Sequence, residues 1–191
     1  MEFFKYKNRV PPAKGRMLVS EPYLPDPNFE RTIILMCEHN QDGSFGFVLN
    51  KPSLAKVGDL VDGMGDFEVP VFVGGPVQQD TLHYIHRCGD LEDAIQISDD
   101  IYWGGNFENL VLKIDTNQLA HEDIKFFIGY SGWSPGQLEE ELKADSWIVS
   151  DQINQLLVFE TDPAVMWQQA LKLMGGRFSV YSNYPVDPRM N

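Results

Sequence analysis

The stretch from Thr32 to Cys37 limits the fold more than any other feature of these 191 residues. It reads Thr-Ile-Ile-Leu-Met-Cys, a nearly unbroken apolar run that contains β-branched residues. A strand that faces water on one side alternates apolar and polar residues, whereas this run is typical of a central strand covered on both faces. We therefore expect this segment to lie inside a sheet with packed layers on either side.

The residues that follow predict a hairpin. Residues 40–43 have the composition of a turn, with Asp42-Gly43 as the tight element, and residues 46–50 read as a returning strand. A hairpin argues against a purely parallel sheet. Further strand candidates share short apolar or β-branched runs and lie at 16–20, 69–73, 81–86, 95–97, 101–103, 124–130 and 147–149.

Two helix starts are well marked. Ser134-Pro135-Gly136-Gln137 has the pattern of a capping box with an N-terminal proline, and its helix should run to about Lys143. Asp162-Pro163 repeats the cap and proline, and Gly175-Gly176 ends that helix. Weaker signals predict a short helix capped by Ser53 and a helix over 107–114; residues 155–160 stay open between strand and helix, and the last 15 residues look irregular. These elements predict an α/β (α+β) domain with helices packed on a mixed sheet.

The charge is unevenly distributed. The chain carries 15 basic and 28 acidic side chains, a net charge of −13, yet residues 1–20 hold five basic groups and one acidic group. We divide the chain into an irregular basic lead-in, residues 1–14, and a single globular domain, residues 15–191. The lead-in is either an arm that grips an anionic partner or a solvated tail on the acidic body. The acidic body repels polyanions and anionic membranes, so we expect no nucleic-acid or membrane partner.

The cysteine content and the lack of targeting signals indicate the cytoplasm. A chain of this size with only Cys37 and Cys88 has no disulfide framework, although a bridge between these two stays open. We find no run of 18 apolar residues and no apolar signal-peptide stretch within residues 1–20. Cytoplasmic location is therefore the expectation.

No residue pattern supplies a catalytic mechanism. Residues 129–133, Gly-Tyr-Ser-Gly-Trp, miss the G-x-S-x-G pattern of a nucleophile elbow at the last position, and all four histidines precede Ser131. We interpret the segment as a strand-to-helix turn. An anion site on the following helix is the alternative, which Glu139–Glu141 oppose by repulsion.

Phosphate and metal motifs are also weak. Gly63-Met-Gly65 fails the dinucleotide fingerprint because position 68 is Glu. Asp80, His83 and His86 would share one helix face, but the β-rich run 81–86 predicts a strand, which puts His83 opposite the other two. His39, near Cys37 and Glu38, is a weaker metal candidate still. We therefore predict no catalytic residue, no cofactor and no metal.

The best candidate for a binding surface lies where apolar strands end. Ligands of open α/β sheets bind at strand ends, and Gly74-Gly75-Pro76 and Asn50 follow such ends. Aromatic anchors of the Gly129–Gln137 segment join the same rim if the strands are neighbours, although core and turn roles compete. The candidate surface comprises Asn50, Gly74, Gly75, Pro76, Tyr130, Gly132, Trp133 and Gln137.

Several motifs occur together in a fixed order. They are Gly15-Arg-Met-Leu-Val-Ser-Glu-Pro22, Phe29-Glu-Arg-Thr32, Gly46-Phe-Val-Leu-Asn-Lys-Pro52, Gly74-Gly-Pro-Val77 and Gly129-Tyr-Ser-Gly-Trp133, which continues through Ser134-Pro-Gly-Gln-Leu-Glu-Glu-Glu-Leu142. Over roughly residues 15–175 the chain resembles the YqgE/AlgH family of bacterial proteins. The resemblance implies a cytosolic α/β protein with a mixed, partly split sheet, and it supplies no catalytic mechanism. The AlgH name suggests a role in transcription, but the chain has no recognisable helix-turn-helix.

Three functions remain to be separated. The first is a non-enzymatic binding or regulatory protein that acts through a protein partner, and the missing acid–base and nucleophile sets favour it. The second is an enzyme or small-ligand binder that uses the rim at Gly74–Val77 and Gly129–Gln137. The third is nucleic-acid binding through the basic lead-in. Oligomeric state does not follow from the residues.

Overall fold

The computed structural model describes residues 10–65 and 67–186, within which ten strands form one sheet. The strand order is β10-β1-β2-β3-β9-β6-β8-β7, and β4 pairs with β5, which pairs with β9. In chain order the strands are β1 Met17–Ser20, β2 Ile33–Asn40, β3 Gly43–Val48, β4 Pro52–Lys56, β5 Pro70–Val73, β6 Val77–His86, β7 Ile95–Ser98, β8 Ile101–Trp103, β9 Ile124–Trp133 and β10 Trp147–Ser150. β5 and β9 run parallel, whereas the other pairs are antiparallel, so the predicted mixed sheet is confirmed.

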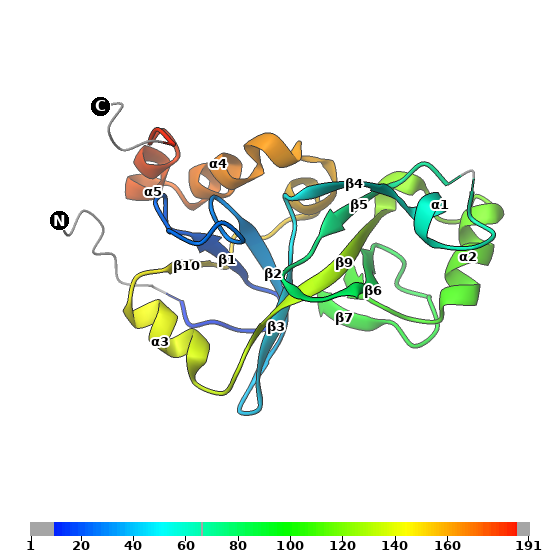
Figure 1. Ribbon diagram of the computed structural model, residues 1–191, viewed down its shortest axis with the longest axis horizontal. Coiled ribbons are helices and arrows are strands. Elements are labelled where there is room, and N and C mark those ends of the chain that lie inside the picture. The colour runs from blue at the N-terminus through cyan, green and yellow to red at the C-terminus, as the bar shows by residue number, and fades with distance from the viewer. Residues whose placement is uncertain (1–9, 66, 187–191) are drawn as a thin grey trace.

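Strand β9 joins the two halves of the sheet (Figure 1). Its first half pairs with β6 on one edge, through residues 124–128, and with β5 in parallel through residues 126–128. Its last residues, 131–133, pair with β3 instead. One half of the sheet therefore contains β10, β1, β2 and β3, the other contains β4 to β8, and the expected partial split falls at β9.

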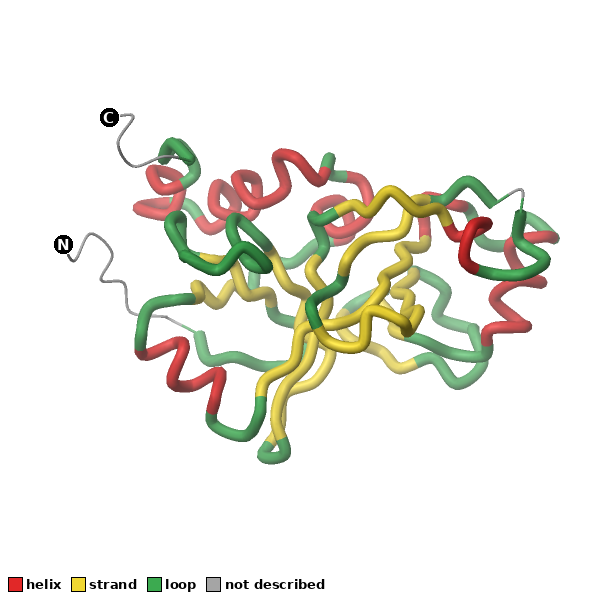
Figure 2. The backbone as a smooth tube through the Cα atoms, viewed as in Figure 1, coloured by secondary structure: helices red, strands yellow, loops and turns green. Residues whose placement is uncertain are grey.

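Helices cover both faces of this sheet (Figure 2). They are α1 Val57–Leu60, α2 Phe107–Asp115, α3 Gln137–Lys143, α4 Pro163–Met174 and α5 Gly176–Tyr181, with a 3-10 turn at His121–Asp123. In Figure 1, α4 lies above the sheet, α3 at its lower left and α2 at its right. The predicted start of α4 is confirmed, because the Asp162 carboxylate accepts the Ala164 N–H at 2.9 Å and Pro163 is the first helical residue. Within the described residues, no helix has the length and apolar composition needed to cross a bilayer.

Strand β2 has the two covered faces that its sequence predicts. Ile33, Leu35 and Cys37 pack in the cluster that includes Met166 of α4, and they are at most 3% exposed. Ile34 and Met36 point to the opposite face and pack in the cluster that includes α3. Alternate residues of one strand therefore supply two separate cores, which explains why the run is apolar at every position.

Three local expectations need correction. Ser53 does not cap a helix, because it lies in β4, where pairing with β5 overrides the helical spacing. Helix α1 begins only at Val57, where the Lys56 N–H donates to the Asp59 carboxylate at 2.8 Å.

The last 15 residues, expected to be irregular, include most of α5, and Phe178 of this helix packs against the cluster that contains α4. The open segment forms a π-helical turn, Leu156–Glu160. Residues 10–14 form neither helix nor strand, and the first nine residues of the predicted lead-in lie outside the described residues.

Candidate functional site

The segment Gly129–Trp133 is the end of β9, so its interpretation as a strand-to-helix turn is wrong. Pairing of Gly132 with Phe45 and of Trp133 with Ser44 extends the strand to its last residue. The turn comes afterwards and ends at Gly136, whose φ of 78° lies in the left-handed region. The expected helix start is therefore wrong, because the N-cap is Gly136 and not Ser134, and Pro135 precedes the helix. Only the reciprocal contact of the capping box is present, since the Ser134 N–H donates to Gln137 Oε1 at 3.0 Å.

Glu141 ties this strand end to α3 and β10 through hydrogen bonds. Its Oε2 accepts the indole N–H groups of Trp133 and Trp147, each at 2.8 Å. Its Oε1 accepts the side-chain amide of Gln137 at 3.0 Å. We call these four residues the tryptophan brace. Trp133 is only 6% exposed, so it and Gln137, both predicted surface residues, are engaged in holding the fold together.

Asn50 and Gly74 of the predicted rim are likewise engaged in hydrogen bonds to backbone groups of the fold. The Asn50 side chain accepts the Ile33 N–H at 3.1 Å and donates to the Arg31 carbonyl at 2.9 Å. The Gly74 carbonyl accepts the Val48 N–H at 2.8 Å. A Cβ on Gly75 would lie 2.2 Å from the Tyr130 carbonyl, so only glycine permits this crossing of β9.

The rim residues divide between two hollows. Asn50, Gly75 and Pro76 line a hollow of about 360 Å³. Tyr130, Gly132 and Trp133 line a larger one of about 580 Å³, which we call the seam groove. Gly74 and Gln137 line neither of these hollows. The structure therefore divides the predicted residues between separate hollows and does not place them on one continuous surface.

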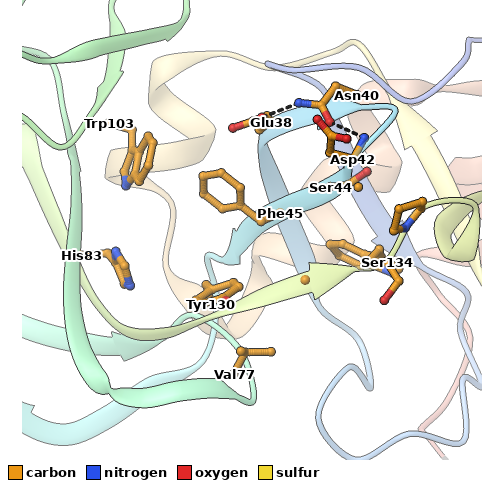
Figure 3. A pocket seen from close by; sticks show the side chains of 14 residues that line it. Glu38, Asn40, Asp42, Ser44, Phe45, Val77, His83, Trp103, Tyr130 and Ser134 are labelled. Carbon is orange, nitrogen blue, oxygen red and sulfur yellow. Dashed lines mark hydrogen bonds between the residues drawn. The ribbon is translucent and has the colours of Figure 1, made fainter.

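Aromatic rings form the floor of the seam groove (Figure 3). Phe45 of β3 stands edge-on to Trp103 of β8, with ring centroids 5.0 Å apart, and to Tyr130 of β9 at 6.1 Å. His83 of β6 also lines the groove, 6.0 Å from the Tyr130 ring. All four side chains are partly exposed. The groove lies at the seam, because β3 belongs to one half of the sheet while β6 and β8 belong to the other.

The tip of the β2–β3 hairpin supplies the polar side of the groove. Glu38, Asn40 and Asp42 line it and are exposed. Asn40 holds the tip together, because its amide donates to the Glu38 carboxylate and its Oδ1 accepts the Asp42 N–H at 2.8 Å. Two carboxylates therefore stand beside the aromatic floor (Figure 3).

The histidines considered for a metal site do not converge. Burial lowers the pKa of His83, so the ring is uncharged at neutral pH, and its Nε2 lies 2.9 Å from Thr81 Oγ1. His86 is fully buried; its Nδ1 accepts the Cys88 N–H, and its Nε2 lies 2.8 Å from the Gly104 carbonyl oxygen. Among the residues that the structure describes, no group of three potential ligands comes together. The two cysteines are both free and buried, which settles the alternative of a bridge between them.

Ser131, the near-match to a nucleophile, is inaccessible. Its hydroxyl is fully buried and donates to the Gly74 carbonyl at 3.0 Å. A different serine lines the groove: Ser44 Oγ lies 2.7 Å from His39 Nδ1, and His39 Nε2 lies 3.8 Å from Glu139 Oε1. The order is reversed relative to a serine-protease triad, in which Nε2 faces the serine, and 3.8 Å is too long for a hydrogen bond.

Sequence reasoning missed most of the groove. Phe45, Trp103, Glu38 and Asp42 were not candidates, although the hairpin that carries three of them was predicted. One signal was available, since residues close to an Asp-Gly turn must project together from the hairpin tip. The approach of Trp103 from β8 depends on tertiary structure, and no local pattern encodes it.

Comparisons with known proteins place these observations in a family context. The AlgH-like family model matches residues 17–179. A UPF0301 protein of Cytophaga hutchinsonii is 47% identical over 181 residues, which cover 94% of this chain and 99% of that protein. A UPF0301 protein of Bacteroides thetaiotaomicron is 37% identical and covers 100% of this chain and 97% of its own length.

Solved structures share the fold. A crystal structure of a protein from Corynebacterium diphtheriae has a TM-score of 0.76 at 20% identity, covering 93% of this chain and 95% of its own. The solution structure of the AlgH protein from Pseudomonas aeruginosa has a TM-score of 0.71 at 24% identity, with coverages of 94% and 98%. At these identities the likeness concerns the architecture alone.

Proposed function

This chain belongs to the AlgH-like family, and we propose that it is a non-enzymatic binding protein that acts through a protein partner. The seam groove carries the proposal, because its floor consists of partly exposed aromatic rings on three strands. Aromatic side chains dominate interface energetics, since each buries a large area with few rotatable bonds. The free, buried cysteines support a cytoplasmic location, which forms part of the proposal.

The polar groups around the groove favour binding over catalysis. The hydroxyl of Thr81 engages His83, and Asn40 bridges the hairpin tip, so both serve to fix side chains. Catalysis by acid–base chemistry needs a base aligned with a nucleophile and oriented by a third group. Beside the groove, His39 contacts Ser44, but its other nitrogen lies 3.8 Å from Glu139, too far for an orienting hydrogen bond. The groove offers partly exposed rings and exposed carboxylates, which suit recognition of a surface.

A pull-down with groove variants tests the proposal. We expect Trp103→Leu and Tyr130→Leu to lose the proteins that the wild-type chain retains from a bacterial lysate. Leu156→Ala is the matched control, because Leu156 is 62% exposed and does not line the groove. Circular dichroism should show that all three variants are folded. Retention of the same proteins by every variant would contradict a role for the groove.

Ester hydrolysis at Ser44 is the second candidate function. The 2.7 Å contact between Ser44 Oγ and His39 Nδ1 favours it, because an imidazole can activate a hydroxyl at that distance. A fluorophosphonate probe that labels the wild-type chain but not Ser44→Ala would support a hydrolase. Equal absence of labelling in both proteins would leave the contact as a cross-strand pair of the hairpin.

A further inference from the structure

The seam groove joins aromatic rings to carboxylates that form no ion pair with any described residue, and we infer that it receives an arginine side chain of the partner protein. The inference rests on the proposed function and specifies the chemistry of the occupant. Two independent features carry it, the floor and the hairpin tip, and each favours a cation.

The floor attracts cations through its rings. The faces of aromatic rings carry negative potential, and a cation within about 6 Å of a ring centroid is held by it. The Trp103 and Tyr130 rings are inclined to Phe45 by 65° and 79°, so the three rings form a recess instead of a flat stack. His83, uncharged at neutral pH because burial lowers its pKa, adds no opposing charge.

The hairpin tip adds negative charge at the same groove. Glu38 and Asp42 both line it; the Asn40 amide donates to the Glu38 carboxylate, and Asn40 Oδ1 accepts the backbone N–H of Asp42 at 2.8 Å. Among the described residues, the ion pairs involve Glu68, Asp90, Asp123, Glu139, Glu140 and Glu160, and neither Glu38 nor Asp42 takes part in one. Within the described part of the chain, two exposed carboxylates therefore lie beside aromatic rings without an ion-pair partner.

Arginine satisfies both features better than lysine. Its planar guanidinium stacks on aromatic faces and offers paired N–H donors to a carboxylate, whereas a lysine ammonium is a strongly hydrated point charge. The net charge of −13 also favours the approach of a basic segment from a distance.

Indole NMR signals offer a site-specific test. We would titrate the chain with a blocked Gly-Arg-Gly peptide, with its lysine form, and with a citrulline form that keeps the shape of arginine but lacks the charge. The Trp103 indole N–H should shift. The Trp167 indole, which donates to the Ser20 carbonyl at 3.0 Å in the core, is the internal control. We expect the arginine peptide to bind about tenfold more tightly than the citrulline peptide, with lysine between them.

Carboxylate variants separate the charge from the rings. The Glu38→Gln/Asp42→Asn variant should bind the arginine and citrulline peptides with similar affinity, whereas Glu108→Gln/Asp115→Asn, with two exposed carboxylates of α2, should keep the preference. Equal affinity of all three peptides for the wild-type chain would overturn the arginine inference while leaving the groove as a binding site. If no peptide shifts Trp103 at millimolar concentration, the inference fails, and the pull-down decides separately on the proposed function.

Discussion

The tryptophan brace and the seam groove meet at the end of β9, where Trp133 belongs to the brace and also lines the groove, and they use aromatic residues differently. In the brace, the indoles of Trp133 and Trp147 are buried, and both donate to Glu141. In the groove, Tyr130 and Trp103 stay partly exposed beside carboxylates that pair with no basic group in residues 10–65 and 67–186. The brace is complete within the chain, whereas the groove leaves its rings and charges available to a second molecule.

The difference teaches that residue type does not distinguish a structural site from a binding site. Trp133 and Tyr130 are three residues apart in the same strand, and either could anchor a partner by composition alone. What separates them is whether their polar atoms and ring faces already have partners in the fold. Substitutions that remove such partners should therefore affect stability more in the brace than in the groove.

Removal of the Glu141 carboxylate should cause the largest loss of stability among the substitutions considered, because it breaks the brace. Glu141→Leu leaves two indole N–H groups without their acceptor, and each unsatisfied buried donor costs about 1–3 kcal/mol. We expect the free energy of unfolding to fall by about 3 kcal/mol in urea titrations. Glu140→Leu on the same helix is the control, because Glu140 is exposed, and it should change stability by less than about 0.5 kcal/mol. Equal losses would mean that the brace does not stabilise the fold.

Lys125 extends the comparison, because it is buried like the brace residues but forms no ion pair with any carboxylate that the structure describes. It is 6% exposed, its Nζ lies 3.3 Å from the Leu49 carbonyl and 4.3 Å above the Phe72 ring, and burial lowers its pKa from 10.5 to about 8. The charged form is therefore penalised by folding. Lys125→Met should stabilise the chain at pH 7 by about 2 kcal/mol.

The pH dependence of stability identifies this effect. Between about pH 8 and 10.5 the unfolded chain keeps the Lys125 proton that the folded chain has released, so this residue makes stability rise with pH in that window. Below pH 8 both states are protonated and the penalty is constant. The wild-type minus variant difference should follow this rise in urea titrations at several pH values. A difference that is flat from pH 7 to 10.5 would exclude a depressed pKa.

Trp103→Leu tests how much the groove floor contributes to the stability of the fold. Trp103 is partly exposed and packs against Phe45, so we expect a loss of about 1 kcal/mol, smaller than for Trp133→Leu in the core. Thermal unfolding of the two variants side by side gives the comparison. Similar losses would indicate that the floor is simply an open part of the core.

The hairpin carboxylates should matter least for stability. Exposed charges outside ion pairs contribute little to stability, and a glutamine amide oxygen at position 38 can still accept the Asn40 amide that Glu38 accepts. Glu38→Gln/Asp42→Asn should therefore raise stability by at most about 0.5 kcal/mol. Urea titration at low and moderate salt would measure this gain. A loss above 1 kcal/mol would assign these residues to the fold instead of the groove.

The sequence predicted those parts of the fold that local chemistry encodes. The apolar run of β2, the Asp42-Gly43 hairpin and the Asp162-Pro163 helix start all appear where expected. The prediction that Ser53 caps a helix was wrong, because pairing of β4 with β5 outweighs a local capping preference. The split sheet followed from family resemblance, not from any residue pattern.

The site was less predictable, for a physical reason. Tyr130, Gly132 and Trp133 were candidates, and they do line the groove, but Phe45 and Trp103 were not. Those two rings lie far apart in the chain, at positions 45 and 103. They meet because β3 and β6 are the neighbours of β9 in the sheet and β8 is the next strand after β6. No periodicity or turn signal carries that kind of information.

Strand β9 has a consequence for how the molecule comes apart. It is hydrogen-bonded to β5 and β6 at one end and to β3 at the other, so neither half of the sheet has a complete edge without it. If one half melts, the backbone groups of β9 on that side lose their partners, which penalises the surviving half. The chain should therefore unfold as a single cooperative unit, and cleavage at the seam should yield no fragment that keeps a native structure.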